Sequence, residues 1–176
     1  MKSIVQIGII SMLMIVSSAV RGQIGSAEAQ VNLSLAQVMS VEVGHNSVVI
    51  PMDLPVHFQN GNSSGELINH LQVNSILPYF LRVRAEESTF SLDGMVTPLP
   101  VSVIRIDATV NSGTGVTTAT PLYLSASSGD VLQSTANEVS QSFNVSYSIP
   151  QAQTSSFLNR EPGVYTTTVI YTIVPQ

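Results

Sequence analysis

The chain has 176 residues, of which 44% are hydrophobic and 10% are charged, and it contains no cysteine. From Gln30 onward, four arginines stand against ten acidic residues with no lysine, a net charge of −6. This composition excludes disulfide bonds and argues against binding to nucleic acid or anionic lipid, whose affinity comes largely from neutralised phosphates. It also excludes lysine-dependent covalent cross-links, so we expect any assembly to be non-covalent.

Residues 1–22 have the pattern of a secretory signal peptide. Lys2 supplies the positive start, and an apolar run of secretory type follows it. Two cleavage positions compete, one after Gly22 and one after Ala29; the second fits the small-x-small rule better but lies farther from the apolar run. A retained membrane helix is the alternative, although the run is at or below the roughly 18–20 residues that a span needs. We therefore predict a secreted protein whose residues 30–176 form one domain.

Alternation of apolar and polar residues predicts strands in both of the first two segments of this domain. In residues 30–43 the odd positions are apolar, with only Gln37 out of place: Val31, Leu33, Leu35, Met39, Val41 and Val43. In residues 47–58 the even positions carry the apolar face: Val48, Ile50, Met52, Leu54, Val56 and Phe58. Residues 44–46 between the two segments predict a hairpin turn. Pro51 and Pro55 mark the second strand as an edge strand or a bulged one.

Further strands are predicted along the rest of the chain, with turn residues between them. Residues 60–65, NGNSSG, predict a surface loop, and residues 111–120 predict a flexible segment. Strands are expected within residues 69–75, 78–85, 90–92, 101–110, 121–126, 131–134, 143–149 and 163–174. The last segment is apolar on both faces, which favours a place inside a sheet or beneath a neighbour over an exposed edge.

Eight to ten short strands at fairly regular spacing indicate an all-β fold: a single immunoglobulin-like β-sandwich of mostly antiparallel strands. A transmembrane β-barrel of eight strands has a similar length and is the alternative architecture. Pro51 and Pro55 would break a closed ladder, and the usual terminal aromatic residue is missing. The pattern therefore favours the sandwich.

No catalytic or metal-binding motif stands out in the sequence. The three histidines, His45, His57 and His70, are far apart, and with no cysteine a zinc site is not expected; each histidine is predicted to be exposed or at a sheet edge. Neither a Gly-x-Ser-x-Gly nor a Ser-x-x-Lys motif is present. Glu86 and Glu87, if on a strand, point to opposite faces and cannot act as a carboxylate pair. We predict a protein that is not an enzyme and has no cofactor.

Carbohydrate binding usually requires aromatic platforms, and this chain has no tryptophan. Most of its five tyrosines fall in phase with apolar strand positions, where they are expected to pack in the core or on a sheet. Tyr123, which follows the flexible segment and lies between leucines, is the best candidate for an exposed contact. A soluble periplasmic or extracellular module that binds a glycan or a peptide is therefore an alternative function.

Two blocks of the sequence resemble small bacterial surface sandwich domains of the fimbrial-subunit-like and WxL-like type. The central block contains Leu71, Val73, Tyr79, Leu81 and Val83, and the chain closes on P-G-x-Y-x-x-x-x-x-Y-T-I at residues 162–173. The Trp-x-Leu pair and the disulfide found in such families are missing, so wall binding is not carried over. The resemblance implies a structural or adhesive protein of the bacterial surface, with a pilus- or fimbria-like filament as its expected assembly.

Subunits of such families often assemble by donating a strand to a neighbour, whose edge strand has unpaired backbone groups. Here the natural donor is the N-terminal segment, because cleavage turns it into a free end. The candidate assembly strand contains Val31, Leu33, Leu35, Met39 and Val41. The alternative is that this segment is the first strand of its own sandwich. Expected partners are further copies of the chain, other surface proteins or a glycan, and not nucleic acid or a small-molecule cofactor.

Overall fold

The computed structural model describes residues 30–135 and 139–176. Leu35–Gln176 form one compact unit, and residues 30–34 belong to a separate unit. The expected signal peptide, residues 1–22, and both residues that precede the expected cleavage positions lie outside the described residues. The description below therefore concerns Leu35–Gln176.

This unit is built from antiparallel sheets, which confirms the all-β, sandwich-like prediction: 53% of the described residues lie in strands and 11% in helices. The largest sheet has five strands, in the spatial order β1 (Met39–Val43), β2 (Gly61–Ser75), β10 (Ser140–Pro150), β6 (Arg105–Ser112) and β8 (Leu122–Tyr123). A second sheet has four strands, in the order β12 (Val169–Pro175), β3 (Tyr79–Ala85), β9 (Gly129–Ser134) and β7 (Val116–Ala119). In the described part of the chain, every registered strand pair is antiparallel.

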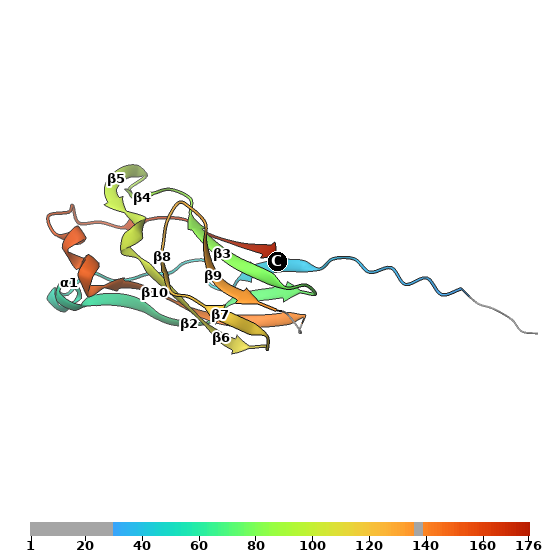
Figure 1. Cartoon of the computed structure of the whole chain (residues 1–176). Helices are drawn as coiled ribbons and strands as arrows, with labels where there is room; N and C mark the ends of the chain where they lie inside the picture. Colours follow the sequence, from blue (N-terminus) through green and yellow to red (C-terminus); the bar gives the residue numbers. More distant parts are fainter. Residues whose placement is uncertain (1–29, 136–138) are drawn as a thin grey trace, which may run out of the picture. The chain divides into compact units, whose positions relative to one another are not determined.

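A small third sheet and three short helices complete the described part of the fold. The sheet has the order β11 (Tyr165–Thr166), β4 (Thr89–Leu92) and β5 (Met95–Pro100). The helices are α1 (Pro55–Asn60) and the two 3-10 helices η1 (Val101–Val103) and η2 (Gln151–Phe157). Figure 1 shows α1 and η2 together at one end of the sandwich, where the two helices contact each other. The structure thus has more strands than the eight to ten expected, because several are only two to four residues long.

The core lies between the two larger sheets and is supplied by alternating residues of their central strands. In β3 the buried residues are Tyr79, Leu81, Val83 and Ala85; in β10 the buried apolar residues are Phe143, Val145, Tyr147 and Ile149. With Leu71 and Val73 of β2, most of them belong to one hydrophobic cluster. The predicted alternation in these strands is confirmed, and it joins the two sheets because each presents its apolar face to the other.

The predicted hairpin of residues 30–43 and 47–58 is wrong. Only Met39–Val43 of the first segment is a strand, and its partner is β2. The second segment contains no strand and ends in helix α1, in which Pro55 occupies the first turn. Proline has no N–H to give to a sheet ladder, but its fixed φ suits the start of a helix. Val48 and Ile50 still pack against the core, so their part of the predicted apolar face is retained.

The predicted loop at residues 60–65 is also wrong, because all but its first residue belong to β2. Gly61 and Gly65 have positive φ values of 80° and 72°, and the register between β2 and β10 shifts twice along their length. Such irregularities are where glycine is found inside strands. The turn-like composition therefore marks bulges within a long strand.

The C-terminal segment forms two strands in two different sheets. β11 lies beside β4, and β12 lies beside β3 at the edge of the four-stranded sheet. Of the two places expected for this segment, the one inside a sheet is wrong for β12, which lies at an edge. β12 nonetheless contacts β1 of the opposite sheet, and Tyr171 and Ile173 pack against the core. This packing accounts for the apolar residues on one face of β12.

Candidate functional site

The residues of the candidate assembly strand fall into two groups in the structure. Val31, Leu33 and Leu35 are exposed and lie outside any strand, and Leu35 is 81% exposed. Met39 and Val41 belong to β1 and pack against the hydrophobic cluster. The prediction of one continuous strand over residues 30–43 is therefore wrong for residues 30–38. An alternating pattern forms a strand only where a second backbone is available to pair with it.

β1 is held on one side only. Met39 pairs with Ser75 and Val41 with Val73, and the Ile76 N–H donates to the Val38 carbonyl oxygen at 3.3 Å just before β1 begins. On its other side, β1 has no strand among the described residues, because it is the first strand in the order of its sheet. The outer backbone groups of an edge strand can accept a further strand.

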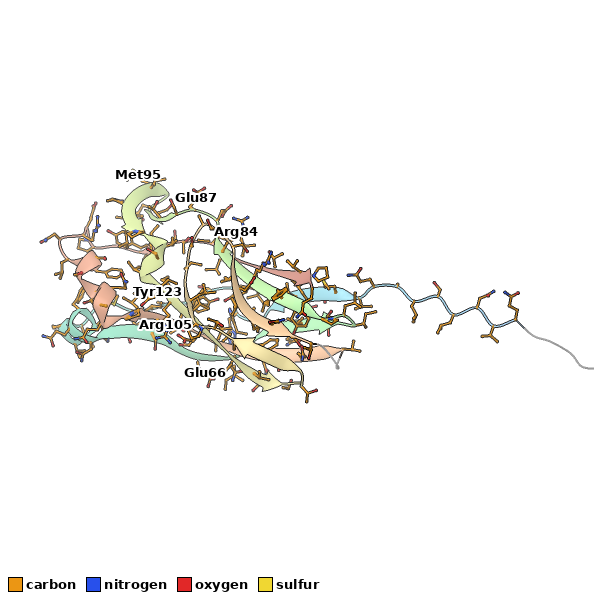
Figure 2. The ribbon with its side chains drawn as sticks, in the orientation of Figure 1. Glu66, Arg84, Glu87, Met95, Arg105 and Tyr123 are labelled. Atoms are coloured by element: carbon orange, nitrogen blue, oxygen red, sulfur yellow. The ribbon has the colours of Figure 1, made fainter. Side chains whose placement is uncertain are left out.

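Tyr123 lies in β8 at the opposite edge of the same sheet and is 47% exposed. It stands across from Arg105 of β6, as Figure 2 shows, and the Arg105 guanidinium donates to the Asp107 carboxylate at 2.7 Å. The structure thus presents an exposed aromatic ring beside an ion pair.

A polar cleft of about 160 Å³ lies between the loop after β3 and the segment that joins β11 to β12. Its lining residues are Glu86, Glu87, Thr89, Ser91, Thr166, Thr167 and Thr168. The expectation that the two glutamates point to opposite faces is wrong, because β3 ends at Ala85 and strand alternation stops there. The Thr167 hydroxyl is buried with no hydrogen-bond partner in the described structure. The cleft is smaller than the roughly 300 Å³ at which ligand pockets begin.

A buried polar network, absent from the sequence predictions, joins the two larger sheets. His70 of β2 is 1% exposed, and its Nε2 lies 3.0 Å from the Tyr147 hydroxyl of β10. That hydroxyl lies 2.8 Å from the Tyr171 hydroxyl of β12. The Nδ1 of His70 lies 3.3 Å from the Nδ1 of His45, an exposed residue two positions after β1. The network therefore runs from the surface to the strand at the edge of the opposite sheet.

The pairing of β1 with β2 brings the two histidines together. Val43 is opposite Leu71, and the Gly44 N–H donates to the His70 carbonyl oxygen at 2.7 Å. His45 comes next, and its ring faces that of His70 with centroids 5.4 Å apart. The prediction that His70 is exposed or at an edge is wrong, whereas His45 is exposed as predicted. His45 and His70 are 25 positions apart in the sequence. Their contact could have been predicted only by knowing that β1 pairs with β2.

Burial controls the protonation of this network. Burial and, to a smaller extent, the neighbouring His45 together lower the pKa of His70 to about 4, because a positive charge is unfavourable in the interior and beside a second one. Burial also raises the pKa of Tyr147 to about 12 and raises that of Tyr171. All three groups are therefore neutral over the physiological pH range and are held by hydrogen bonds alone.

His57 is separate from this network. Its Nδ1 lies 3.0 Å from the Asp53 carboxylate, and the Leu54 N–H donates to the same Nδ1 at 3.3 Å. The residue thereby closes the first turn of α1 and has a structural role.

Comparisons with models of protein families and with curated proteins find no match to this chain. Among the helices of the described residues, none has the length and apolar character that crossing a membrane requires.

Proposed function

We propose that the chain is a structural or adhesive protein of the bacterial cell surface, whose copies assemble non-covalently through the N-terminal segment. The observation that carries this proposal is the exposed position of Val31, Leu33 and Leu35, which alternate as a strand does but lie outside any strand. Burying an apolar side chain of this size contributes about 1.5–3 kcal/mol, so three exposed ones favour association. An extended neighbour would also satisfy their backbone groups.

Two further features support the same proposal. β1, which follows the segment directly, lies at a sheet edge, where backbone groups can pair with another chain. The absence of cysteine, and of lysine after Lys2, leaves hydrogen bonds and apolar contacts as the means of assembly. A protein of the cell surface with this design would be a filament or coat subunit.

The test is a truncation that removes residues up to 37 from a mature chain beginning at Gln23 or Gln30. The full mature protein is expected to form polymers visible by electron microscopy and by sedimentation. The truncated protein is expected to stay monomeric with an unchanged circular dichroism spectrum, because β1 begins at Met39 and remains intact. If the truncation unfolds the domain, the segment is an integral part of the sandwich.

A matched pair of variants shows whether assembly depends on the apolar face of the N-terminal segment or only on the length of that segment. Replacing Val31, Leu33 and Leu35 by serine is expected to abolish assembly, because the apolar face is lost. Replacing Asn32 and Ser34 by alanine leaves that face intact and is expected to preserve assembly. A wild-type protein that remains strictly monomeric and never enters surface fibres would rule out the filament form of the proposal.

The second candidate function is binding of a glycan or a peptide, and the exposure of the Tyr123 ring favours it. A glycan array with the wild-type protein and a Tyr123→Ala variant would test it. Saturable binding by a monomer that the variant loses would replace assembly as the main function. Equal signals from both proteins would exclude a role for this ring.

A further inference from the structure

We propose that His45 and His70 form a binding site for a divalent transition-metal ion of the Zn²⁺ type, open to solvent on the His45 side. The proposal rests on the 3.3 Å separation of their two Nδ1 atoms, on the position of His45 at the surface and on the hydrogen bonds that fix His70. It is independent of assembly, since both residues belong to one chain.

The distance between the two nitrogens fits a shared metal ion. Zinc binds imidazole nitrogen at about 2.0–2.1 Å with tetrahedral angles, which places two such nitrogens about 3.3–3.4 Å apart. The Nδ1 atoms of His45 and His70 already have this separation, at 3.3 Å. An ion between them would therefore require only a small reorientation of the exposed ring.

The far side of His70 has a hydrogen-bond partner, which metal-binding histidines also have, although here it is a tyrosine hydroxyl. Its Nε2 lies 3.0 Å from the Tyr147 hydroxyl, which in turn lies 2.8 Å from the Tyr171 hydroxyl. When Nε2 donates its proton to Tyr147, the lone pair of His70 is left on Nδ1, facing His45. Hydrogen bonds of this kind fix the tautomer and the orientation of the ring and raise the basicity of the ligand.

Metal binding leaves the number of protons on the two histidines unchanged. In the free protein, one Nδ1–H group donates to the other Nδ1 across the 3.3 Å gap. When an ion binds, two nitrogen–metal bonds form, this hydrogen bond breaks, and the proton of His45 moves to its own Nε2 on the exposed side. The described residues contain no group of three or more histidine, cysteine or acidic side chains that could hold a metal ion, so water from solvent completes the coordination of the ion.

The location of the site gives it a structural consequence. His45 follows β1 directly, whereas His70 is connected through Tyr147 and Tyr171 to β10 and β12. A bound ion would therefore attach the end of β1 to the interior of the sandwich. Since an ion that binds only the folded state stabilises it, the Tm of the protein should rise with metal concentration.

The test uses untagged mature protein, because the chain contains only three histidines and an added histidine tag would mask the site. Zn²⁺ is titrated by calorimetry and by NMR of the three histidine rings. We expect one saturable site per chain, shifts in the signals of His45 and His70, an unchanged signal from His57, and a rise in Tm. Absence of saturable binding at millimolar Zn²⁺ would overturn the proposal.

Three variants assign the site. His45→Ala removes an exposed ligand and should fold normally, yet it is expected to raise the Kd more than about tenfold. His57→Ala is the matched control and should leave the Kd unchanged. Tyr147→Phe removes the hydrogen bond behind His70 and should weaken binding by about 10- to 100-fold. Binding that survives His45→Ala, or that His57→Ala removes, would place the ion elsewhere and contradict the proposal.

Discussion

The Tyr147 hydroxyl is the central member of the polar network, because it lies within hydrogen-bond distance of both His70 and Tyr171. Tyr147→Phe keeps the ring in the core and removes only this hydroxyl. Two buried groups then lose a partner, and we expect the free energy of unfolding to fall by about 1–3 kcal/mol. Urea denaturation followed by circular dichroism measures this change.

Tyr123→Phe is the matched control for that experiment. It removes a hydroxyl from an exposed ring, so the free energy of unfolding should change by no more than about 0.5 kcal/mol. Equal values for the two variants would show that the network adds nothing to stability.

A second prediction at this scale concerns alkaline pH and Tyr79, whose hydroxyl donates to the side-chain oxygen of Gln141. Burial raises the pKa of Tyr79 from its ordinary value of 10.0 to about 12. Between these values, the unfolded chain loses this proton while the folded chain keeps it, so stability falls as the pH rises through this window. With about 1.4 kcal/mol per pKa unit, the loss approaches 3 kcal/mol.

Equilibrium denaturation at a series of pH values from neutral to strongly alkaline measures this loss. Tyr147 contributes in the same direction, because burial also raises its pKa to about 12. Tyr79→Phe should therefore reduce the slope of stability against pH in this window without removing it. A slope that is the same in wild type and variant would contradict the assignment to Tyr79.

At the scale of the element, substitution of two glycines in β2 tests which feature of this irregular strand requires glycine. Both Gly61 and Gly65 have positive φ, which costs other residues about 1–2 kcal/mol. A Cβ at Gly61 would collide with the carbonyl oxygen of Ile149, whereas one at Gly65 meets no atom within 4 Å. Gly61→Ala should therefore destabilise the protein by at least about 1 kcal/mol more than Gly65→Ala.

The comparison is made by urea denaturation of the two alanine variants side by side. Gly61 has a ψ of −178°, a backbone region adopted almost only by glycine, so the difference between the variants reports this backbone cost together with the close approach of β2 to β10. If the variants lose equal stability, a local shift of the backbone relieves the collision. The spacing between β2 and β10 would then adjust to an added Cβ.

The same elements show how far the sequence alone determines the fold. The alternation in β3 and β10 predicted their buried faces correctly, because these strands lie in the middle of sheets and each has one apolar face toward the core. Alternation failed for residues 47–58 because it carries no information on pairing, and Pro55 favours a helix start. Residues 60–65 were mistaken for a loop because glycine and asparagine occur both in turns and at bulges.

The candidate sites were less predictable than the fold, for a related reason. The exposed ring of Tyr123 was expected from its place after the flexible segment, and the structure gives it an exposed fraction of 47%. The contact between His45 and His70 could not be expected, because it depends on which strand pairs with β1. The burial of Tyr171 at a sheet edge likewise depends on contacts with the opposite sheet.

At the scale of the whole molecule, net charge opposes the proposed assembly. Each copy has a charge of −6 over residues 30–176, so neighbouring copies repel one another. The contacts proposed to hold them together are apolar side chains and backbone hydrogen bonds, which salt hardly screens. Repulsion between exposed charges, in contrast, extends about 30 Å at 0.01 M salt and only about 10 Å at 0.1 M.

The rate and extent of polymerisation should therefore increase as the salt concentration is raised from about 0.01 M to about 0.1 M. Light scattering and sedimentation of the mature protein measure this, with the variant that lacks the residues up to 37 as a control that should remain monomeric at every salt concentration. A decrease in assembly with salt would mean that ion pairs between copies hold the polymer together. In that case the few cations of the surface would be the contacts to mutate, beginning with Arg82, which pairs with Asp130 at 2.7 Å within its own chain.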